Sequence, residues 1–171
     1  VCLLRDLGSA LAPDNAFAII QGLETVALRM RQHCANAEYV VDFLKKHKEV
    51  TKVIYSTEHD KPIADRAKKY LKGGNGPMIG IELKGGIETG KRFIESLKMF
   101  YHVANIGDAR SLAIHPATTT HSQLTEDELT AAGVTPGYER LCIGLEHIDD
   151  IINDLDQALD KSSKGKLKAV S

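Results

Sequence analysis

The sequence has no tryptophan, three cysteines and almost no net charge. Its 22 Lys and Arg residues oppose 23 Asp and Glu residues, so no basic field would attract nucleic acid or an anionic membrane. Cys2, Cys34 and Cys142 are widely separated, form no CxxC pair and lie at no metal-ligand spacing with histidine. These absences argue against a nucleic-acid-binding protein, a disulfide scaffold and a zinc protein. We therefore expect free thiols in a reducing compartment.

Long apolar runs are also lacking. No stretch approaches the roughly 20 apolar residues of a membrane span, and the opening VCLL is too short and lacks the basic flank of a signal peptide. We therefore expect a cytoplasmic protein with neither a membrane nor nucleic acid as partner. The chain begins with Val1 inside an apolar run, so we interpret it as a piece of a longer protein. The end KSSKGKLKAVS has the composition of a fraying tail.

One folded domain fits a chain of 171 residues with 43% hydrophobic and 26% charged residues. After an Asp14 or Asn15 cap, apolar spacing predicts about thirty residues of helix, bent at Gly22 or near His33. A helix this long should also pack against something outside the domain. Its expected apolar positions are Phe17, Ile20, Leu23, Ala27, Met30, Cys34, Ala37, Val41 and Leu44.

Four strands and several shorter helices follow the long helix. Thr125 and Glu128 have the spacing of a capping box, which predicts a short helix ending at Gly133. Because the strands are only half apolar and no strand-GxGxxG-helix segment occurs, we expect an α+β two-layer domain with helices over one face of the sheet. The expected strands are TKVIY, MIGIELK, FYHVANIG and RLCIGLE, and the other helices PIADRAKKYLK, IETGKRFIESLK and HIDDIINDLDQALDK.

Two stretches contain the candidate binding residues, NIGDARSLAIHPATTTH (105–121) and ERLCIGLEH (139–147). Arg140 offers a planar fork that matches a carboxylate bidentately, although from the residues alone a solvated edge arginine is the commoner interpretation. Asn105 is equally a turn-forming residue. His115 and His121 have no acidic or cysteine partner to complete a metal site, so we expect them to order the loop.

A complete active site is not found in the sequence. The lysines lie in charged helix faces, such as Lys45, Lys46, Lys68 and Lys69, or in the tail, and none has the apolar setting of a catalytic amine. There is no GxSxG elbow, no Walker loop and no Ser/His/Asp order. We therefore expect no catalytic residue and no metal site in this chain.

Three long segments resemble the C-terminal part of the Cys/Met-metabolism family of pyridoxal-phosphate enzymes. They are RDLGSALAPDNAFAIIQGLETVALRMRQHCANA, NIGDARSLAIHPATTTHSQL and GVTPGYERLCIGLEHIDDIINDLDQAL. The likeness runs to about Leu159. Within the family, two segments are most similar to the O-acetylhomoserine sulfhydrylase branch, NIGDARSL and HPATTTHSQL.

The resemblance implies a fold-type I enzyme and a division of this chain. Residues 1–48 would be a linking segment and long helix, residues 49–161 the small C-terminal domain, and residues 162–171 a polar tail. The small domain would hold a mostly antiparallel four-stranded sheet with helices on one face. The large domain, absent here, would hold pyridoxal 5′-phosphate and the Schiff-base lysine, so no cofactor is expected on this chain.

The resemblance also implies binding roles for three residues. Arg140 matches the family arginine that grips the substrate α-carboxylate. Asn105 stands where many relatives have a serine beside that carboxylate, and Thr120 should brace the same wall, more by supporting it than by direct contact. His115 and His121 are expected to be structural.

The implied parent is a transferase of methionine biosynthesis and sulfur metabolism. It would convert O-acetyl-L-homoserine and sulfide to L-homocysteine and acetate, as a homo-oligomer, a tetramer in most relatives. The isolated chain should be inactive. The alternatives are a related cystathionine synthase or lyase, a methionine γ-lyase, or a free-standing small-molecule-binding or dimerisation module.

Overall fold

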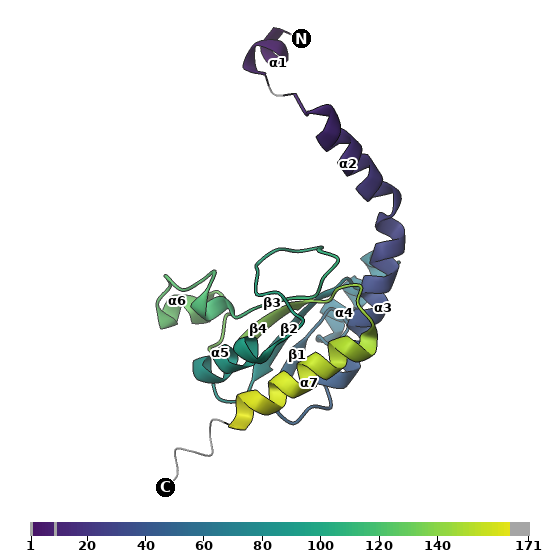
Figure 1. Cartoon of the computed structure of the whole chain (residues 1–171). Helices are drawn as coiled ribbons and strands as arrows, with labels where there is room; N and C mark the ends of the chain where they lie inside the picture. The colour runs from purple at the N-terminus through teal and green to yellow at the C-terminus, as the bar shows by residue number, and fades with distance from the viewer. Residues whose placement is uncertain (1, 9, 165–171) are drawn as a thin grey trace.

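A computed structural model describes residues 2–8 and 10–164, so residues 165–171 of the expected tail lie outside the described part (Figure 1). The elements, in chain order, are α1 (Cys2–Leu7), α2 (Pro13–Glu24), α3 (Val26–Leu44), β1 (Val50–Ile54), α4 (Lys61–Tyr70), β2 (Met78–Leu83), α5 (Ile87–Ser96), β3 (Leu112–Ile114), the 3₁₀ turn η1 (Pro116–Thr118), α6 (Glu126–Ala131), β4 (Tyr138–Cys142) and α7 (Ile148–Lys164).

The four strands form one sheet in the order β1-β2-β4-β3, and each neighbouring pair is antiparallel. Strand β4 therefore lies inside the sheet, between β2 and β3. Opposite Arg140 stand Gly80 of β2 and Ile114 of β3. This sheet confirms the expected fold class, and it settles the strand direction, which residue spacing alone had left open.

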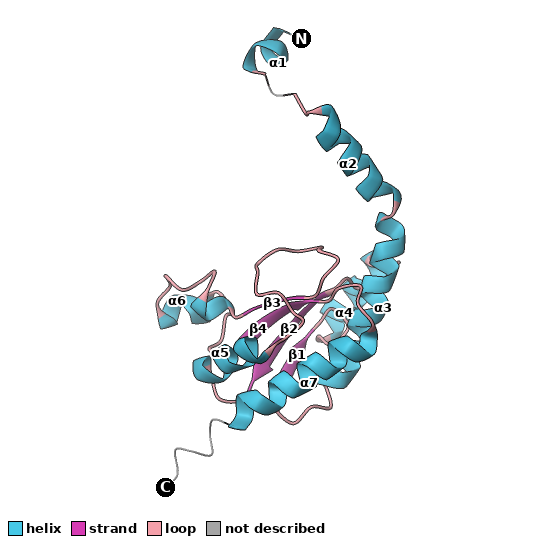
Figure 2. Cartoon of the chain, viewed as in Figure 1, coloured by secondary structure: helices cyan, strands magenta, loops and turns pink. Residues whose placement is uncertain are grey.

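Helices α3, α5 and α7 cover one face of the sheet (Figure 2). The side chains of Ile79, Ile81 and Leu141 point into this helical layer, where Phe93 of α5 and Leu155 of α7 are fully buried. Each such side chain contributes about 1.5–3 kcal/mol when it leaves water. Because side chains alternate along a strand, Gly80, Tyr138 and Arg140 belong to the opposite, uncovered face.

The long N-terminal helix is broken at Thr25, neither at Gly22 nor near His33 as predicted. Thr25 leaves helical geometry with φ −106° and ψ 1°. The Gly22 carbonyl, which a continuous helix would pair with an amide four residues on, instead accepts a hydrogen bond from the Arg29 guanidinium. The predicted cap was also wrong, because α2 begins at Pro13 after Ala12.

The two halves of the long helix differ in their surroundings. Of the predicted apolar positions, Cys34, Ala37, Val41 and Leu44 of α3 are buried as expected. Helix α2 has no buried residue and projects from the domain, leaving Phe17 65% exposed (Figure 1). The apolar face of α2 therefore has no partner within the described residues.

The predicted third strand, FYHVANIG, is not a strand. Within it only Tyr101 forms a bridge, to Leu112, and the segment continues as an exposed loop. The third strand lies after this loop, at Leu112–Ile114, where three fully buried residues pair with β4. The half-apolar alternation of the loop was misleading because its valine and isoleucine stay in solvent.

Other predicted features are present. The capping box is formed: the Thr125 hydroxyl accepts from the Glu128 amide, and the Glu128 carboxylate accepts from the Thr125 amide. Gly133 follows α6 with φ 74°. Helix α7 continues to Lys164, further than its sequence pattern indicated. Within the described residues, no helix combines the length and apolarity needed to cross a membrane.

Candidate carboxylate-binding site

Arg140 is the third of five residues in β4, so it lies in the middle of a strand rather than at its start. Its side chain is half-buried on the face opposite α3, α5 and α7, where its Nη2 donates to the Ala104 carbonyl oxygen at 2.6 Å. No carboxylate within residues 2–8 and 10–164 forms an ion pair with it. The guanidinium therefore keeps an unneutralised charge and N–H groups available for an anionic ligand.

A hollow of about 370 Å³ lies beside Arg140 on the same face. The Tyr138 ring lies across Gly80, since a Cβ at residue 80 would come within 2.7 Å of the ring. Burial raises the pKa of Tyr138, while the charge of Arg140 opposes the rise. The lining contains no lysine and no carboxylate; its residues are Ile54, Tyr55, Ser56, His59, Ile63, Asn75, Met78, Ile79, Gly80, Tyr138 and Arg140. This composition suits a small anion and offers no amine for a Schiff base.

Asn105 is brought near Arg140 because the residue before it, Ala104, is hydrogen-bonded to Arg140. Because Arg140 donates to the Ala104 carbonyl, the exposed loop that carries Asn105 passes over the uncovered face beside the guanidinium. On the far side of this loop, Leu112 and Ile114 stand opposite Cys142 and Arg140. The two stretches singled out in the sequence, 105–121 and 139–147, thus contain the adjacent strands β3 and β4. The loop before β3 lies on the solvent side of this pair.

Thr120 is not brought to Arg140 or Asn105 by any hydrogen bond in the described part of the chain. It is exposed after η1, and its hydroxyl contacts Nδ1 of His121 at 2.9 Å. The segment that carries Asn105 is therefore hydrogen-bonded to Arg140 through Ala104, whereas Thr120 takes no part in these hydrogen bonds.

His115 is a buried, fully hydrogen-bonded residue. Its Nε2 lies 3.0 Å from the Pro136 carbonyl and its Nδ1 lies 2.9 Å from the Thr118 hydroxyl. Since a carbonyl can only accept, Nε2 carries the proton and Nδ1 accepts from Thr118. Burial lowers the pKa of His115, so it is neutral at neutral pH. Across the described residues, no group of three or more His, Cys, Asp and Glu side chains could hold a metal ion.

Glu139 is a buried acidic residue that the sequence reasoning missed. It points into the helical layer beside Ile81, and neither carboxyl oxygen has a hydrogen-bond partner among the described residues. Burial raises its pKa to about 10, so it is protonated at neutral pH, 4.0 Å from the neutral His115. Helix α5 passes over it at Gly90, where a Cβ would come within 2.4 Å of Oε1. Strand alternation from Leu141 could have revealed its inward orientation.

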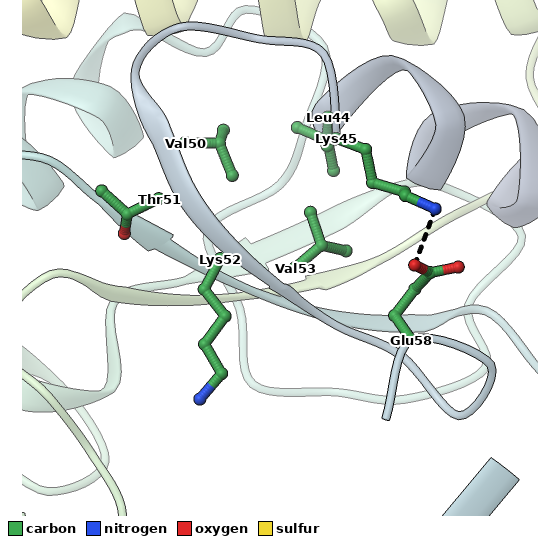
Figure 3. Close-up of a pocket in the computed structure, with 7 residues that line it drawn as sticks. All are labelled: Leu44, Lys45, Val50, Thr51, Lys52, Val53 and Glu58. Atoms are coloured by element: carbon green, nitrogen blue, oxygen red, sulfur yellow. Dashed lines mark ion pairs between the residues drawn. The ribbon is translucent and has the colours of Figure 1, made fainter. Parts of the chain in front are cut away.

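A second hollow, of about 260 Å³, lies at the other edge of the sheet, between the end of α3 and β1 (Figure 3). Its Lys45 and Glu58 side chains point toward one another and form an ion pair of 2.7 Å. Their charges neutralise each other, and no residue lines both this hollow and the one beside Arg140. This hollow is therefore not part of the Arg140 site.

Comparison with known proteins places nearly the whole chain in one family. The profile of the Cys/Met metabolism PLP-dependent enzymes matches residues 2–160. An O-acetyl-L-homoserine sulfhydrylase of Leptospira meyeri is 53% identical over 91% of this chain and 36% of its own length. An L-methionine gamma-lyase of Fusobacterium nucleatum is 46% identical over 92% of this chain and 40% of its own length. The chain thus spans about two fifths of these relatives.

A solved structure gives the same result at the level of the fold. It is assigned to an O-acetylhomoserine (thiol)-lyase of Campylobacter jejuni and carries an N′-pyridoxyl-lysine-5′-monophosphate residue. It matches 92% of this chain and 38% of its own, with a TM-score of 0.83 and 45% sequence identity. The arrangement of helices and strands around Arg140 is therefore one found within a longer, pyridoxal-phosphate-containing chain.

Proposed function

The chain belongs to the family of Cys/Met metabolism PLP-dependent enzymes, and from this we propose that it is the C-terminal part of an O-acetyl-L-homoserine sulfhydrylase. The complete enzyme would convert O-acetyl-L-homoserine and sulfide to L-homocysteine and acetate. This chain would supply the binding site for the substrate carboxylate. The observation that carries the proposal is the Arg140 guanidinium, held on the face of the sheet opposite α3, α5 and α7, where no carboxylate of the described residues pairs with it.

The division of the chain follows from the same proposal. Residues 1–48 would connect to a cofactor-binding large domain, and residues 49–161 would form the small domain. The expected tail, residues 162–171, begins inside α7, which runs to Lys164. Two observations support this: α2 has no buried residue, and the relatives are more than twice as long as this chain. A helix whose apolar residues lie in solvent gains stability when another surface covers them. The large domain would be that partner.

Arg140 would act by orienting the amino acid. One N–H of its Nη2 is engaged by the Ala104 carbonyl, which restricts rotation of the guanidinium plane and leaves the other donors for a carboxylate. Two parallel N–H···O bonds would fix the carboxylate in position and in plane. Asn105, one residue from Ala104, would add a carboxamide donor, and Thr120 would support the wall from outside it.

The reaction also needs groups outside this chain. When bound in the complete enzyme, pyridoxal phosphate supplies an electron sink for the α-carbon of the amino acid. The residues around Arg140 do not fit the cofactor itself, because no lysine lines the hollow beside it. The contribution of this chain would be proximity, since a carboxylate fixed at one end limits where the α- and γ-carbons can lie.

An L-methionine gamma-lyase is the second candidate, because such an enzyme is 46% identical to this chain. The full-length enzyme would be assayed with O-acetyl-L-homoserine plus sulfide, and separately with L-methionine alone. We expect homocysteine and acetate from the first mixture at a kcat/KM at least about tenfold above that for methionine cleavage. Faster release of methanethiol from methionine would instead support the lyase.

The isolated chain is expected to remain inactive and to form no specific Schiff base with pyridoxal phosphate. Amine catalysis needs a lysine with a lowered pKa, whereas a hydrogen bond to Glu58 raises the pKa of Lys45 and one to Asp160 raises that of Lys48. The test is to titrate pyridoxal phosphate and record the Schiff-base absorbance after borohydride reduction and peptide mapping. A stoichiometric adduct on a single lysine would contradict the assignment of the cofactor lysine to the missing domain.

A further inference from the structure

Glu146, just after β4, holds the polypeptide at the end of the loop that carries Asn105. Its Oε1 accepts from the Ser111 amide at 2.7 Å, and its Oε2 accepts from the Ser111 hydroxyl at 3.0 Å. The Ser111 hydroxyl in turn accepts from the Gly144 amide at 2.9 Å. One carboxylate therefore joins the segment before β3 to the segment after β4 through a fully buried serine.

Gly144 makes room for this contact. A Cβ at residue 144 would lie 2.1 Å from Oε2 of Glu146 and 2.5 Å from the Ser111 amide nitrogen. The carboxylate thus occupies the space in which any other residue would have its side chain. Asn36 of α3 fixes the same turn from behind, because its Nδ2 donates to the carbonyls of Gly144 and Glu146 at 3.0 Å each.

The loop itself, residues 102–110, has no apolar anchor. All its residues except Asp108 are exposed, including Val103 and Ile106. Its position therefore depends on its hydrogen bonds, which a loop in solvent can lose one at a time. Its bonds to the rest of the described chain include those from the Leu145 amide to the Ala109 carbonyl and from Arg140 to the Ala104 carbonyl. Just outside the loop, the Tyr101 amide donates to the Ser111 carbonyl.

We propose that Glu146 is a positioning residue for the amino-acid substrate: by clamping Ser111 it holds the 102–110 loop over Arg140, so that the Ala104 carbonyl orients the guanidinium and Asn105 faces the substrate carboxylate. The inference rests on the proposed function of Arg140. Glu146 itself contacts no substrate. Its carboxylate acts only through the loop, and it shares this role with the Ser111 hydroxyl.

The test uses the full-length enzyme and compares Glu146→Ala, Glu146→Gln and Ser111→Ala. Loss of the clamp should raise KM for the amino acid about tenfold in Glu146→Ala, with kcat and KM for sulfide changed less than about twofold. Glu146→Gln keeps one acceptor for the Ser111 amide, so it should restore most of the affinity. The double variant with Ser111→Ala should be no worse than the poorer single variant, because both changes break one clamp.

Asp154→Asn is the matched control. Asp154 is also a buried carboxylate that accepts backbone amides, those of Lys98, Met99 and Phe100 at 2.8 to 3.3 Å. That segment is also anchored by the buried Phe100 side chain. Asp154→Asn should therefore lower Tm without raising KM. Hydrogen exchange supplies a readout independent of activity: Glu146→Ala should speed exchange of the Ser111 and Leu145 amides, and Asp154→Asn should not.

Two outcomes would overturn the inference. One is a lower Tm in Glu146→Ala with an unchanged KM, which would make the clamp purely structural; the other is an equal rise of KM in Asp154→Asn, which would make the effect general. The variant Arg140→Ala distinguishes a failure of the positioning role of Glu146 from a failure of the proposed carboxylate-binding role of Arg140. If Arg140→Ala raises KM and Glu146→Ala does not, the carboxylate site stands and the positioning role falls; if neither does, the proposed function of Arg140 falls.

Discussion

Replacing Arg140 with alanine in the full-length enzyme is expected to lower kcat/KM for the amino-acid substrate by about 100- to 1,000-fold. Removing one partner of a charge-assisted, bidentate pair costs about 3–4 kcal/mol when the other partner is left desolvated. Pyridoxal phosphate should remain bound with an unchanged absorption spectrum, because no residue near Arg140 holds it. Steady-state kinetics with varied O-acetyl-L-homoserine, alongside the cofactor spectrum, measure both effects.

Two further variants show whether the effect comes from the geometry of Arg140 or from the loss of any half-buried arginine. Arg140→Lys keeps the charge but not the planar fork, so its kcat/KM should lie between those of the wild type and the alanine variant. Arg92→Ala removes another half-buried arginine that donates to a backbone carbonyl, that of Ser162, on the helical side. It should leave kcat/KM unchanged. A kcat/KM for Arg140→Ala equal to that of the wild type would refute the carboxylate assignment.

Glu139 is expected to make the folded chain less stable as pH rises. Its pKa is about 10 in the folded chain, against an ordinary value of 4.5, so between these values the folded state holds a proton that the unfolded state has released. The stabilising contribution is complete below pH 4.5 and is lost as pH rises toward 10. Linkage then predicts a loss of about 1.4 kcal/mol per pH unit in the free energy of unfolding, or about 3 kcal/mol between pH 6 and pH 8.

The measurement is urea unfolding of the 171-residue chain at pH 6 and pH 8. Glu139→Gln has the same shape without an ionisable group, so its free energy of unfolding should change less with pH by about that amount. Glu95→Gln changes an exposed residue of α5 and should follow the wild type. Equal pH dependence in the wild type and Glu139→Gln would show that Glu139 is not buried as a neutral acid.

Local patterns were sufficient for much of the fold. The alternation of Ile79, Ile81 and Leu83 located β2, the spacing of Ile151, Leu155 and Leu159 located α7, and the capping box located α6, because each pattern reflects contacts within one element. The break at Thr25 and the loop after Tyr101 were not predictable in this way. At the break, the Gly22 carbonyl is bonded by the Arg29 side chain, which no periodic pattern reveals, and the loop ends where Leu112 pairs with the distant strand β4.

In the candidate site, too, the sequence indicated a single residue but not the contacts that it makes with distant parts of the chain. Arg140 could be selected as a candidate because the sequence around it resembles a known family motif, whereas its own chemistry alone did not distinguish it from an ordinary edge arginine. The partners of this residue were not readable: Ala104 lies 36 positions away, and Glu146 is joined to Ser111 across 35 positions. A sequence without aligned relatives does not encode such distant contacts in any local period. Glu139 is the exception, since the alternation of β4 already directed it inward.

The strand order β1-β2-β4-β3 has a consequence for how the chain folds during its synthesis on the ribosome. Strands β2 and β3 are both synthesised before β4, the last strand, yet they join the same sheet only through β4. Until residues near 142 have left the exit tunnel, β1 and β2 are the only neighbours among these four strands that can pair, and the edge of β2 that awaits β4 stays open. Arg140 lies on the strand that closes this gap, so the candidate carboxylate site and the complete sheet would form together.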